Sequence, residues 1–260
     1  MESRRYEKLK HFKIQTRQKL GSGTFGQEYK AWNTITNQNI AAKKVWLEPG
    51  KTSNENRFSS AINELSILQR LENHPNVCSI YDSIFQDDVC WMIMEYCDLG
   101  HLGSYLKENP NLDFESRLKI MQQSTSAVAY MHRQKPPIIH RDIKPENVLL
   151  KNEHHVHTVK ISDFGVSKVC ENGIQDYMKD FFQRKLMKTT CGSHFFLAPE
   201  LSTDYIQQYD STIDVFALGL VHKVVLEFSS ENKKVIPISG KIDMINFCCV
   251  FMHFYSYYSG

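Results

Sequence analysis

Hydrophobic and polar positions follow different periods in different parts of this chain. From residue 14 to residue 46 the apolar runs are short, contain many β-branched and aromatic residues, and are interrupted by Gly or Asn. This pattern predicts strands joined by hairpins. Residues 61–71 instead carry an apolar residue at every third or fourth position, which predicts a helix. The polar stretch 48–60 is expected to connect the last of these strands to that helix.

The remaining pattern adds two strands and then becomes helical. Residues 79–85 and 90–95 have strand character, whereas residues 114–133 and 211–228 have the longer apolar period of helices. In the first of these helices Leu118, Met121, Val128 and Met131 are expected near one face. The sequence therefore predicts an α+β protein with a small strand-rich lobe, a hinge near residues 95–100 and a larger helical lobe.

Composition narrows the function classes only slightly. The 260 residues are 42% hydrophobic and 23% charged, which suits a folded core, and the formal net charge of +2 argues against nucleic acid or an acidic membrane surface as the main partner. The seven cysteines form no C-x-x-C pair, and the first ten residues lack the apolar run of a signal peptide. We therefore expect a reduced, intracellular protein without a cysteine-bound metal.

A glycine-rich segment gives the first indication of chemistry. Residues 20–26 read LGSGTFG, a G-x-G-x-x-G pattern that lets main-chain N–H groups approach phosphate oxygens. A strand-like run follows rather than the helix that a dinucleotide-binding motif requires. Lys43, with Ala41 two residues earlier on the same face, ends the next strand and can reach a phosphate, and Glu64 in the helical run can pair with that lysine.

Two further segments carry much more specific signals. Residues 140–147 read HRDIKPEN and residues 163–165 read DFG, followed by Ala-Pro-Glu at 198–200. In-line phosphoryl transfer needs a carboxylate that accepts or orients a hydroxyl proton, oxygen ligands for Mg²⁺ and a cation near the transferred group. Asp142 suits the first role, Asn147 and Asp163 the second, and Lys144 the third.

With these segments in this order, the chain resembles a eukaryotic protein kinase from residue 20 to residue 219. The resemblance implies a bilobal fold with an antiparallel-sheet N-lobe and helix C at 14–96, a mainly helical and incomplete C-lobe at 97–228, and an atypical tail at 229–260. It also implies Lys43 as the phosphate anchor, Glu64 as its partner, and a spine of Leu68, Ile80, His140 and Phe164 anchored on Asp214. The positions implied to bind ATP are Leu20, Gly21, Ser22, Gly23, Thr24, Phe25, Gly26, Glu28, Ala41, Lys43, the gatekeeper Met94, the hinge residues Glu95, Tyr96 and Cys97, and Leu149.

The resemblance extends to substrates and regulation. Lys144 after Ile143 is similar to the serine/threonine branch, and the segments SDFGVSKVC, TTCGSHFFLAPE and DVFALG are similar to the group named for interaction with PDZ-and-LIM-domain proteins. This implies ATP and Mg²⁺ as cofactors, Ser/Thr-containing protein substrates, and a cytoplasmic or nuclear location. Thr189 and Thr190 lie where activating phosphates often sit, and Arg141 is expected to pair with such a phosphate.

Two departures from the family pattern limit these expectations. Glu28 stands where kinases usually place Val over the adenine ring, which predicts weakened ATP affinity because a carboxylate against an apolar base is costly to desolvate.

A kinase domain also continues well beyond the helix at 211–228, and no arginine follows Arg184 to pair with Glu200. The aromatic segment 244–260 is expected to be a replacement last helix or an alternative terminus rather than a membrane anchor, which needs about 20 residues.

Three functions therefore remain in view. The leading one is an ATP- and Mg²⁺-dependent protein serine/threonine kinase. The second is a kinase-like binding module that does not turn over, and the third, which is less consistent with the Ala-Pro-Glu segment, is a small-molecule kinase. The sequence leaves the oligomeric state open.

Overall fold

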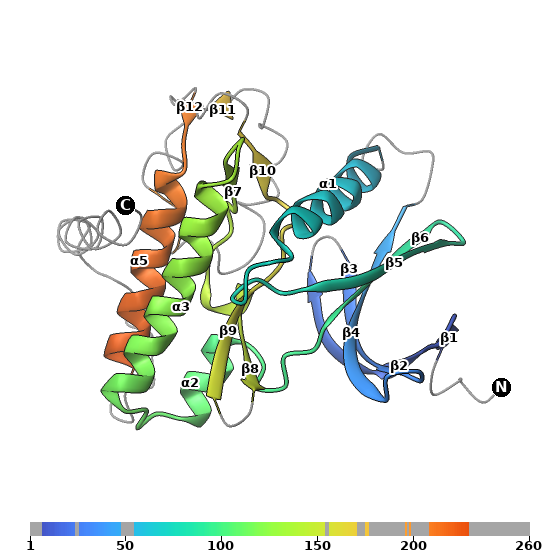
Figure 1. The fold of residues 1–260 in the computed structure, drawn as a ribbon, viewed down its shortest axis with the longest axis horizontal. Helices are drawn as coiled ribbons and strands as arrows, with labels where there is room; N and C mark the ends of the chain where they lie inside the picture. The colour runs from blue at the N-terminus through green and yellow to red at the C-terminus, as the bar shows by residue number, and fades with distance from the viewer. Residues whose placement is uncertain are drawn as a thin grey trace. The chain divides into compact units, whose positions relative to one another are not determined.

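The computed structural model describes residues 7–23, 26–47, 55–153, 156–170, 175–176, 196, 198 and 208–228. The chain divides into two compact units, one formed by residues 1–73 and 78–97 and the other by residues 74–77 and 98–260. Figure 1 traces the elements of both units.

The first unit is built on a six-stranded antiparallel sheet in the order β1-β2-β3-β4-β6-β5. Lys10, in the turn after β1, forms an ion pair with Asp82 of β5 at 3.0 Å, so the sheet curls until its two edges meet. The apolar side chains of Phe12, Ile14 and Trp91 are buried inside this curl. The strands are β1 (Glu7–Leu9), β2 (Phe12–Gly23), β3 (Gly26–Asn33), β4 (Gln38–Trp46), β5 (Ile80–Gln86) and β6 (Val89–Glu95).

Helix α1 (Glu55–Leu71) completes the first unit and differs from the sequence prediction in two ways. It begins six residues before the predicted start. The prediction missed residues 55–60 because they are mostly polar and give no apolar period. The buried face contains Leu65, Leu68 and Leu71 as expected, but Ile62 is 41% exposed.

The second unit contains most of the helix. Helices α3 (Phe114–His132) and α5 (Thr212–Glu227) pack side by side (Figure 1), and α2 (Leu102–Glu108) contacts the short 3-10 turn η1 (Pro145–Asn147). Three two-stranded ladders complete the described part of this unit. They are β7 (Ile138–Ile139) with β10 (Lys168–Val169), β8 (Val148–Glu153) with β9 (Val156–Ile161), and β11 (Gln175–Asp176) with β12 (Gln208–Tyr209).

Polar side chains join α3 to α5 inside the second unit. Arg117 of α3 is buried and donates hydrogen bonds to the main-chain carbonyls of Pro110, Leu112 and Val225, the last of which lies in the final turn of α5. A cation at the C-terminal end of a helix is favourable because the helix dipole is negative there. Of the residues predicted near one face of α3, Val128 and Met131 are fully buried, whereas Leu118 is 39% exposed.

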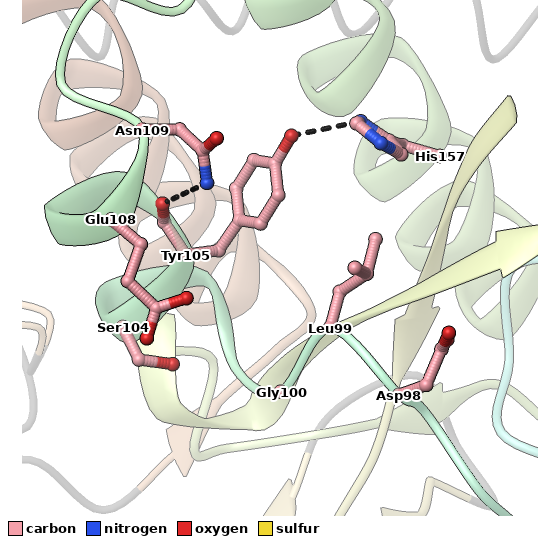
Figure 2. A pocket seen from close by; sticks show the side chains of 8 residues that line it. All are labelled: Asp98, Leu99, Gly100, Ser104, Tyr105, Glu108, Asn109 and His157. Atoms are coloured by element: carbon pink, nitrogen blue, oxygen red, sulfur yellow. Dashed lines mark hydrogen bonds between the residues drawn. The ribbon is translucent and has the colours of Figure 1, made fainter. Parts of the chain in front are cut away.

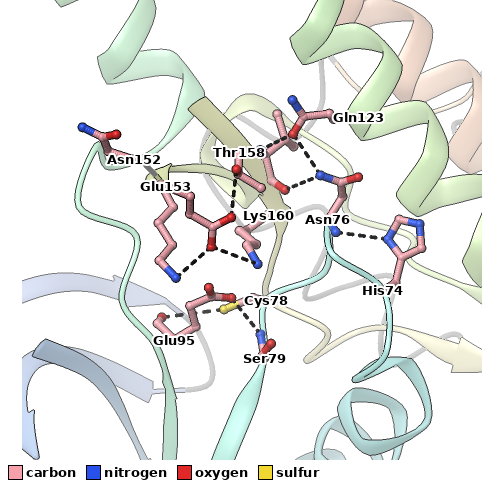
Figure 3. A network of polar contacts seen from close by, with 12 residues as sticks. His74, Asn76, Cys78, Ser79, Glu95, Gln123, Asn152, Glu153, Thr158 and Lys160 are labelled. Atoms are coloured by element: carbon pink, nitrogen blue, oxygen red, sulfur yellow. Dashed lines mark hydrogen bonds and ion pairs between the residues drawn. The ribbon is translucent and has the colours of Figure 1, made fainter. Parts of the chain in front are cut away.

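The segment 74–77 belongs to the second unit because its polar groups bond to α3 and β9. Asn76 donates through its amide nitrogen to Gln123 Oε1 at 2.9 Å (Figure 3) and to the carbonyl of Val159 at 3.0 Å. Its own main-chain carbonyl accepts from the N–H of Ile161. These bonds fix the chain immediately before Cys78, where it returns to the first unit.

The fold class predicted from the sequence is confirmed: an antiparallel sheet with one helix forms the first unit, and a second unit carries the other helices. The lobe limits at residues 96 and 228 stay predictions. Among the residues that the structure describes, no helix is long and apolar enough to cross a membrane.

Candidate functional site

The glycine-rich segment forms the end of the β2–β3 hairpin. Ser22 pairs with Gln27 and Gly23 with Gly26, so a strand follows the motif, as the sequence indicated. A Cβ on Gly26 would lie 2.2 Å from the carbonyl oxygen of Lys44, which only glycine avoids. The hairpin therefore brings bare main chain close to the neighbouring strand.

Lys43 and Glu64 form a buried ion pair within the first unit. Lys43 Nζ lies 2.7 Å from Glu64 Oε1, with the side chains 6% and 2% exposed. The structure thus brings the predicted lysine of β4 together with the predicted glutamate of α1. A cation held in this way is fixed in position rather than hydrated, as a phosphate anchor requires.

The sheet register places Glu28 on the same face as Lys43. Residues directly opposite in an antiparallel pair share a face, and Glu28 is opposite both Gly21 of β2 and Lys43 of β4. Ala41, two residues before Lys43, is opposite Met94 and shares this face as well. Glu28 Oε2 lies close enough to Gly21 that a Cβ there would be 3.7 Å away. The carboxylate consequently lies among the residues predicted to bind the nucleotide.

The predicted hinge begins at Glu95, the last residue of β6, and is mostly buried. Glu95 is 4% exposed, its N–H donates to the carbonyl of Ser79 at 2.9 Å, and its carboxylate accepts from the N–H of Ser79 at 3.3 Å. The thiol of Cys78 donates to the carbonyl of Glu95 at 3.8 Å (Figure 3). The ammonium group of Lys30 lies 4.9 Å from the ring centre of Tyr96. Polar contacts with residues 78–79 therefore hold the main chain at the start of the hinge.

In the second unit Asp142, Lys144 and Asn147 meet in one cluster. Asp142 Oδ2 accepts from Lys144 Nζ at 2.7 Å and from Asn147 Nδ2 at 2.9 Å, and Asn147 Nδ2 also donates to the carbonyl of Asp142 at 2.7 Å. Burial raises the pKa of Asp142, although the positive charge of Lys144 opposes this effect. A carboxylate whose pKa is moved toward neutrality is suited to proton transfer.

The orientation of Asn147 leaves a metal ligand available. Its amide nitrogen is bound to Asp142, so its Oδ1 atom faces away from that residue and can bind a cation. No group of three or more His, Cys, Asp or Glu within the described parts of the chain could hold a metal. Mg²⁺ in phosphoryl-transfer sites takes only one or two protein ligands besides water and phosphate, so the donor set of Asn147 and Asp163 fits it.

Asp214 holds the main chain before Asp142. Its carboxylate is 1% exposed and accepts from the N–H of His140 at 2.7 Å, from the N–H of Arg141 at 2.8 Å and from His132 Nε2 at 3.0 Å. Burial acts to raise the pKa of Asp214, but the hydrogen bond and charge of His132 together with His140 lower it overall. Asp214 thereby fixes Arg141, whose φ of 68° is unusual for a residue other than glycine.

The segment that carries Asp163 is bonded to the same framework. The ring of His140 lies 4.9 Å from the ring of Phe164, and Asp163 has a φ of 61°. Within the second unit, His140 therefore contacts both Phe164, its neighbour in the predicted spine, and Asp214, the predicted anchor of the spine. Sequence reasoning missed His132, whose only signal is its position at the end of α3, eight residues before His140.

Two other predicted residues lie on β2 and β8. Leu20 is 45% exposed on β2, and Leu149 is bridged to His101, whose ring accepts from the N–H of Ser104 at the start of α2. Beside α2 lies a hollow of about 370 Å³, where Tyr105 is hydrogen-bonded to His157 at 2.8 Å (Figure 2). Four predicted site residues fall outside the described residues: Thr24, Phe25, Thr189 and Thr190.

The chain is similar in sequence to several named protein kinases. The chain is 32% identical over 217 residues to the "Serine/threonine protein kinase OSK3" of Oryza sativa subsp. indica, which covers 82% of this chain and 39% of the relative. It is 33% identical over 208 residues to the "Carbon catabolite-derepressing protein kinase" of Saccharomyces cerevisiae, which covers 80% and 29%. It is 31% identical over 211 residues to the "Serine/threonine-protein kinase tousled-like 2" of Mus musculus, which covers 78% and 28%.

The chain therefore spans 39% or less of the length of these three relatives. The family model described as "Protein kinase domain" matches residues 14–237, which is most of the chain and includes every described site residue above. The chain belongs to the protein kinase family.

Proposed function

We propose that this protein is a serine/threonine kinase that transfers the γ-phosphate of ATP to hydroxyl groups of Ser and Thr in protein substrates. The observation that carries the proposal is the cluster in which Asp142 accepts from both Lys144 and Asn147. Burial raises the pKa of Asp142. A carboxylate of this kind can accept or orient the proton of a substrate hydroxyl.

Lys144 supports this role through charge. Its ammonium group lies 2.7 Å from Asp142 and its side chain is 13% exposed. A cation held in a partly dry site interacts more strongly with a negative group than one in water. We assign Lys144 to the transferred phosphoryl group and Asp142 to the attacking hydroxyl.

Asn147 and Asp163 would hold Mg²⁺. When bound, this ion neutralises the phosphate oxygens and orients the terminal phosphate. The contribution of this chain is to present Asn147 Oδ1, because the amide nitrogen is already bound to Asp142.

The first unit supplies the residues proposed to bind the nucleotide. Lys43, held by Glu64 at 2.7 Å, is assigned to the phosphates, and the glycine hairpin offers main-chain N–H groups to them. The main chain of Glu95, Tyr96 and Cys97 is assigned to the adenine. Ala41 and Met94, two further predicted positions on this face, lie opposite each other.

One observation favours the binding-module alternative. Glu28 shares a sheet face with Lys43, where its negative charge opposes the binding of phosphates and an apolar base. A kinase fold with a weak nucleotide site can still bind protein partners.

A phosphotransfer assay separates these two functions. The purified chain would be incubated with Mg·ATP and a mixed pool of Ser and Thr peptides, beside Asp142→Asn and the exposed control Asp87→Asn. We expect Asp142→Asn to lose roughly 10²–10⁴-fold in turnover while Mg·ADP binding is kept, and the control to match wild type. Background turnover by folded wild-type protein would instead contradict the kinase assignment and favour the binding module.

Finer assignments rest on the sequence alone. The group named for PDZ-and-LIM-domain proteins is inferred from three motifs, and the three relatives named above carry other names. A cytoplasmic or nuclear location and phosphorylation at Thr190 are proposed on the same family resemblance.

A further inference from the structure

The hollow beside α2 lies wholly within the second unit, and none of the residues that we assign to catalysis lines it. Its volume is about 370 Å³, and its walls are formed by α2, by the segment that precedes α2 and by His157 of β9 (Figure 2). Ligand-binding pockets in proteins begin at roughly 300 Å³. The hollow is therefore large enough to hold part of a peptide.

Hydrogen bonds hold the walls of this hollow in place. The hydroxyl group of the buried Tyr105 is bonded to His157 Nδ1 at 2.8 Å, which joins α2 to β9 (Figure 2). Asn109 donates to the carbonyl of Tyr105 from its side-chain nitrogen and from its main-chain N–H, both at 2.9 Å. The site is consequently formed before a ligand arrives, which lowers the cost of binding.

The donor groups of the hollow are largely engaged with the protein itself. Ser104 Oγ donates to the carbonyl of His101 at 2.8 Å, and Asn109 Nδ2 and the Tyr105 hydroxyl have the partners just described. What these side chains still offer is mainly the lone pairs of Ser104 Oγ and Asn109 Oδ1. A ligand with many N–H donors would match this set of acceptors.

The charge of the hollow points to the same kind of ligand. Glu108 and Asp98 lie at opposite ends of it, and no lysine or arginine is among the lining residues (Figure 2). Within the described residues, neither carboxylate forms an ion pair. Asp98 Oδ1 accepts from the N–H of Asn152 at 2.9 Å, which fixes the carboxylate and leaves its second oxygen for a ligand. Two carboxylates without a cation attract positive charge.

We propose that this hollow binds a segment of a protein substrate that carries two arginines, one paired with Glu108 and the other with Asp98. The planar guanidinium group has five N–H donors and matches a carboxylate with two parallel hydrogen bonds, which an ammonium group cannot do. Main-chain N–H groups between the two arginines would donate to Ser104 Oγ and Asn109 Oδ1. The identity of the segment as part of a substrate rests on the proposed function, whereas the binding of arginine does not.

An NMR titration tests the binding itself. Capped peptides that lack Ser, Thr and Tyr and carry two arginines at varied spacing would be added to the ¹⁵N-labelled chain, beside the same peptides with neutral citrulline. The main-chain amides of Gly100, Ser104 and Asn109 would report on the hollow. The variants are Asp98→Asn, which keeps an oxygen for Asn152, and Glu108→Gln, singly and together. Glu115→Gln, an exposed glutamate of α3 that does not line the hollow, is the matched control.

We expect at least one arginine peptide to give saturable shifts at these three amides, and its citrulline counterpart to give none. Because the carboxylates are exposed, each single variant should weaken binding by about two- to fivefold. The double variant should weaken it by about 4- to 25-fold if the two sites act independently. Glu115→Gln should bind like wild type. Equal shifts with citrulline, or unchanged affinity in the double variant, would overturn the proposal.

Kinetics test the use of the hollow for substrates. A Ser/Thr peptide would be joined by a flexible glycine linker to the best-binding arginine segment and compared with the same peptide without that segment. In the double variant we expect KM for the long peptide to rise by about 4- to 25-fold with kcat unchanged, and both constants for the short peptide to stay the same. An unchanged KM for the long peptide would overturn the docking role. Absence of turnover by wild type would contradict the proposed function instead, and leave the titration result intact.

Discussion

Replacing Asp214 tests how the chain before Asp142 is held in position. The buried carboxylate of Asp214 accepts from the N–H groups of His140 and Arg141 at 2.7 and 2.8 Å, one on each oxygen. Asp214→Ala removes both acceptors, whereas Asp214→Asn keeps one oxygen and puts an N–H₂ group against the other donor.

The magnitude is worked from the two main-chain N–H donors, and the loss of the contact with His132 Nε2 adds to it. A buried N–H group that loses its acceptor costs about 1–3 kcal/mol, so Asp214→Ala should lower the free energy of unfolding by about 2–6 kcal/mol. This is a large part of a total of about 5–15 kcal/mol. Asp214→Asn should cost about half as much. At roughly 2–4 °C per kcal/mol, the alanine variant should melt roughly 4–24 °C below wild type.

Urea unfolding measures these differences, with the exposed Asp87→Asn as control. Phosphotransfer by the folded fraction should fall at least tenfold in both Asp214 variants, because Asp142 follows the constrained residue Arg141 directly. A loss of stability below about 1 kcal/mol in Asp214→Ala would refute the reasoning. So would equal losses in the Asn and Ala variants, since charge rather than acceptor number would then decide.

Three further predictions concern other buried or charged side chains. Glu28→Val should tighten Mg·ADP binding several-fold by calorimetry, with Glu28→Gln intermediate, and unchanged affinity in both would mean that the carboxylate does not oppose the nucleotide. Burial lowers the pKa of His222 from 6.5 to about 3, so its contribution to stability is complete above pH 6.5 and is lost as the pH falls toward 3. Unfolding at several pH values should show a loss of up to about 1.4 kcal/mol per unit, absent in His222→Leu, and equal slopes would contradict this. Arg117→Met should lower stability by about 2–4 kcal/mol because three carbonyls lose their donor, with Arg117→Lys intermediate, and a melting temperature equal to wild type would contradict the role of this contact.

Local patterns and motifs account for what the sequence could predict. Apolar periods located the strands of the first sheet except β1, together with helices α3 and α5, and the HRDIKPEN and DFG segments pointed to Asp142 and Asp163. The first turns of α1 were missed because they carry no apolar period. The contacts from Arg117 to Val225 and from His132 to Asp214 join residues separated by 108 and 82 positions. Such contacts depend on how α3 packs against α5, which residue spacing does not encode.

Hydrogen bonds join the segment that carries Asp142 to the segment that carries Asp163. Ser162 N donates to the carbonyl of Asn147 at 3.0 Å, and His140 Nε2 lies 3.0 Å from the carbonyl of Ser162. The residue before Asp163 is therefore tied to both ends of the segment that contains Asp142. The relative placement of these two segments is thus set by groups other than the two carboxylates. Asp163 can consequently keep a backbone φ of 61°, because neighbouring bonds hold the chain on its N-terminal side.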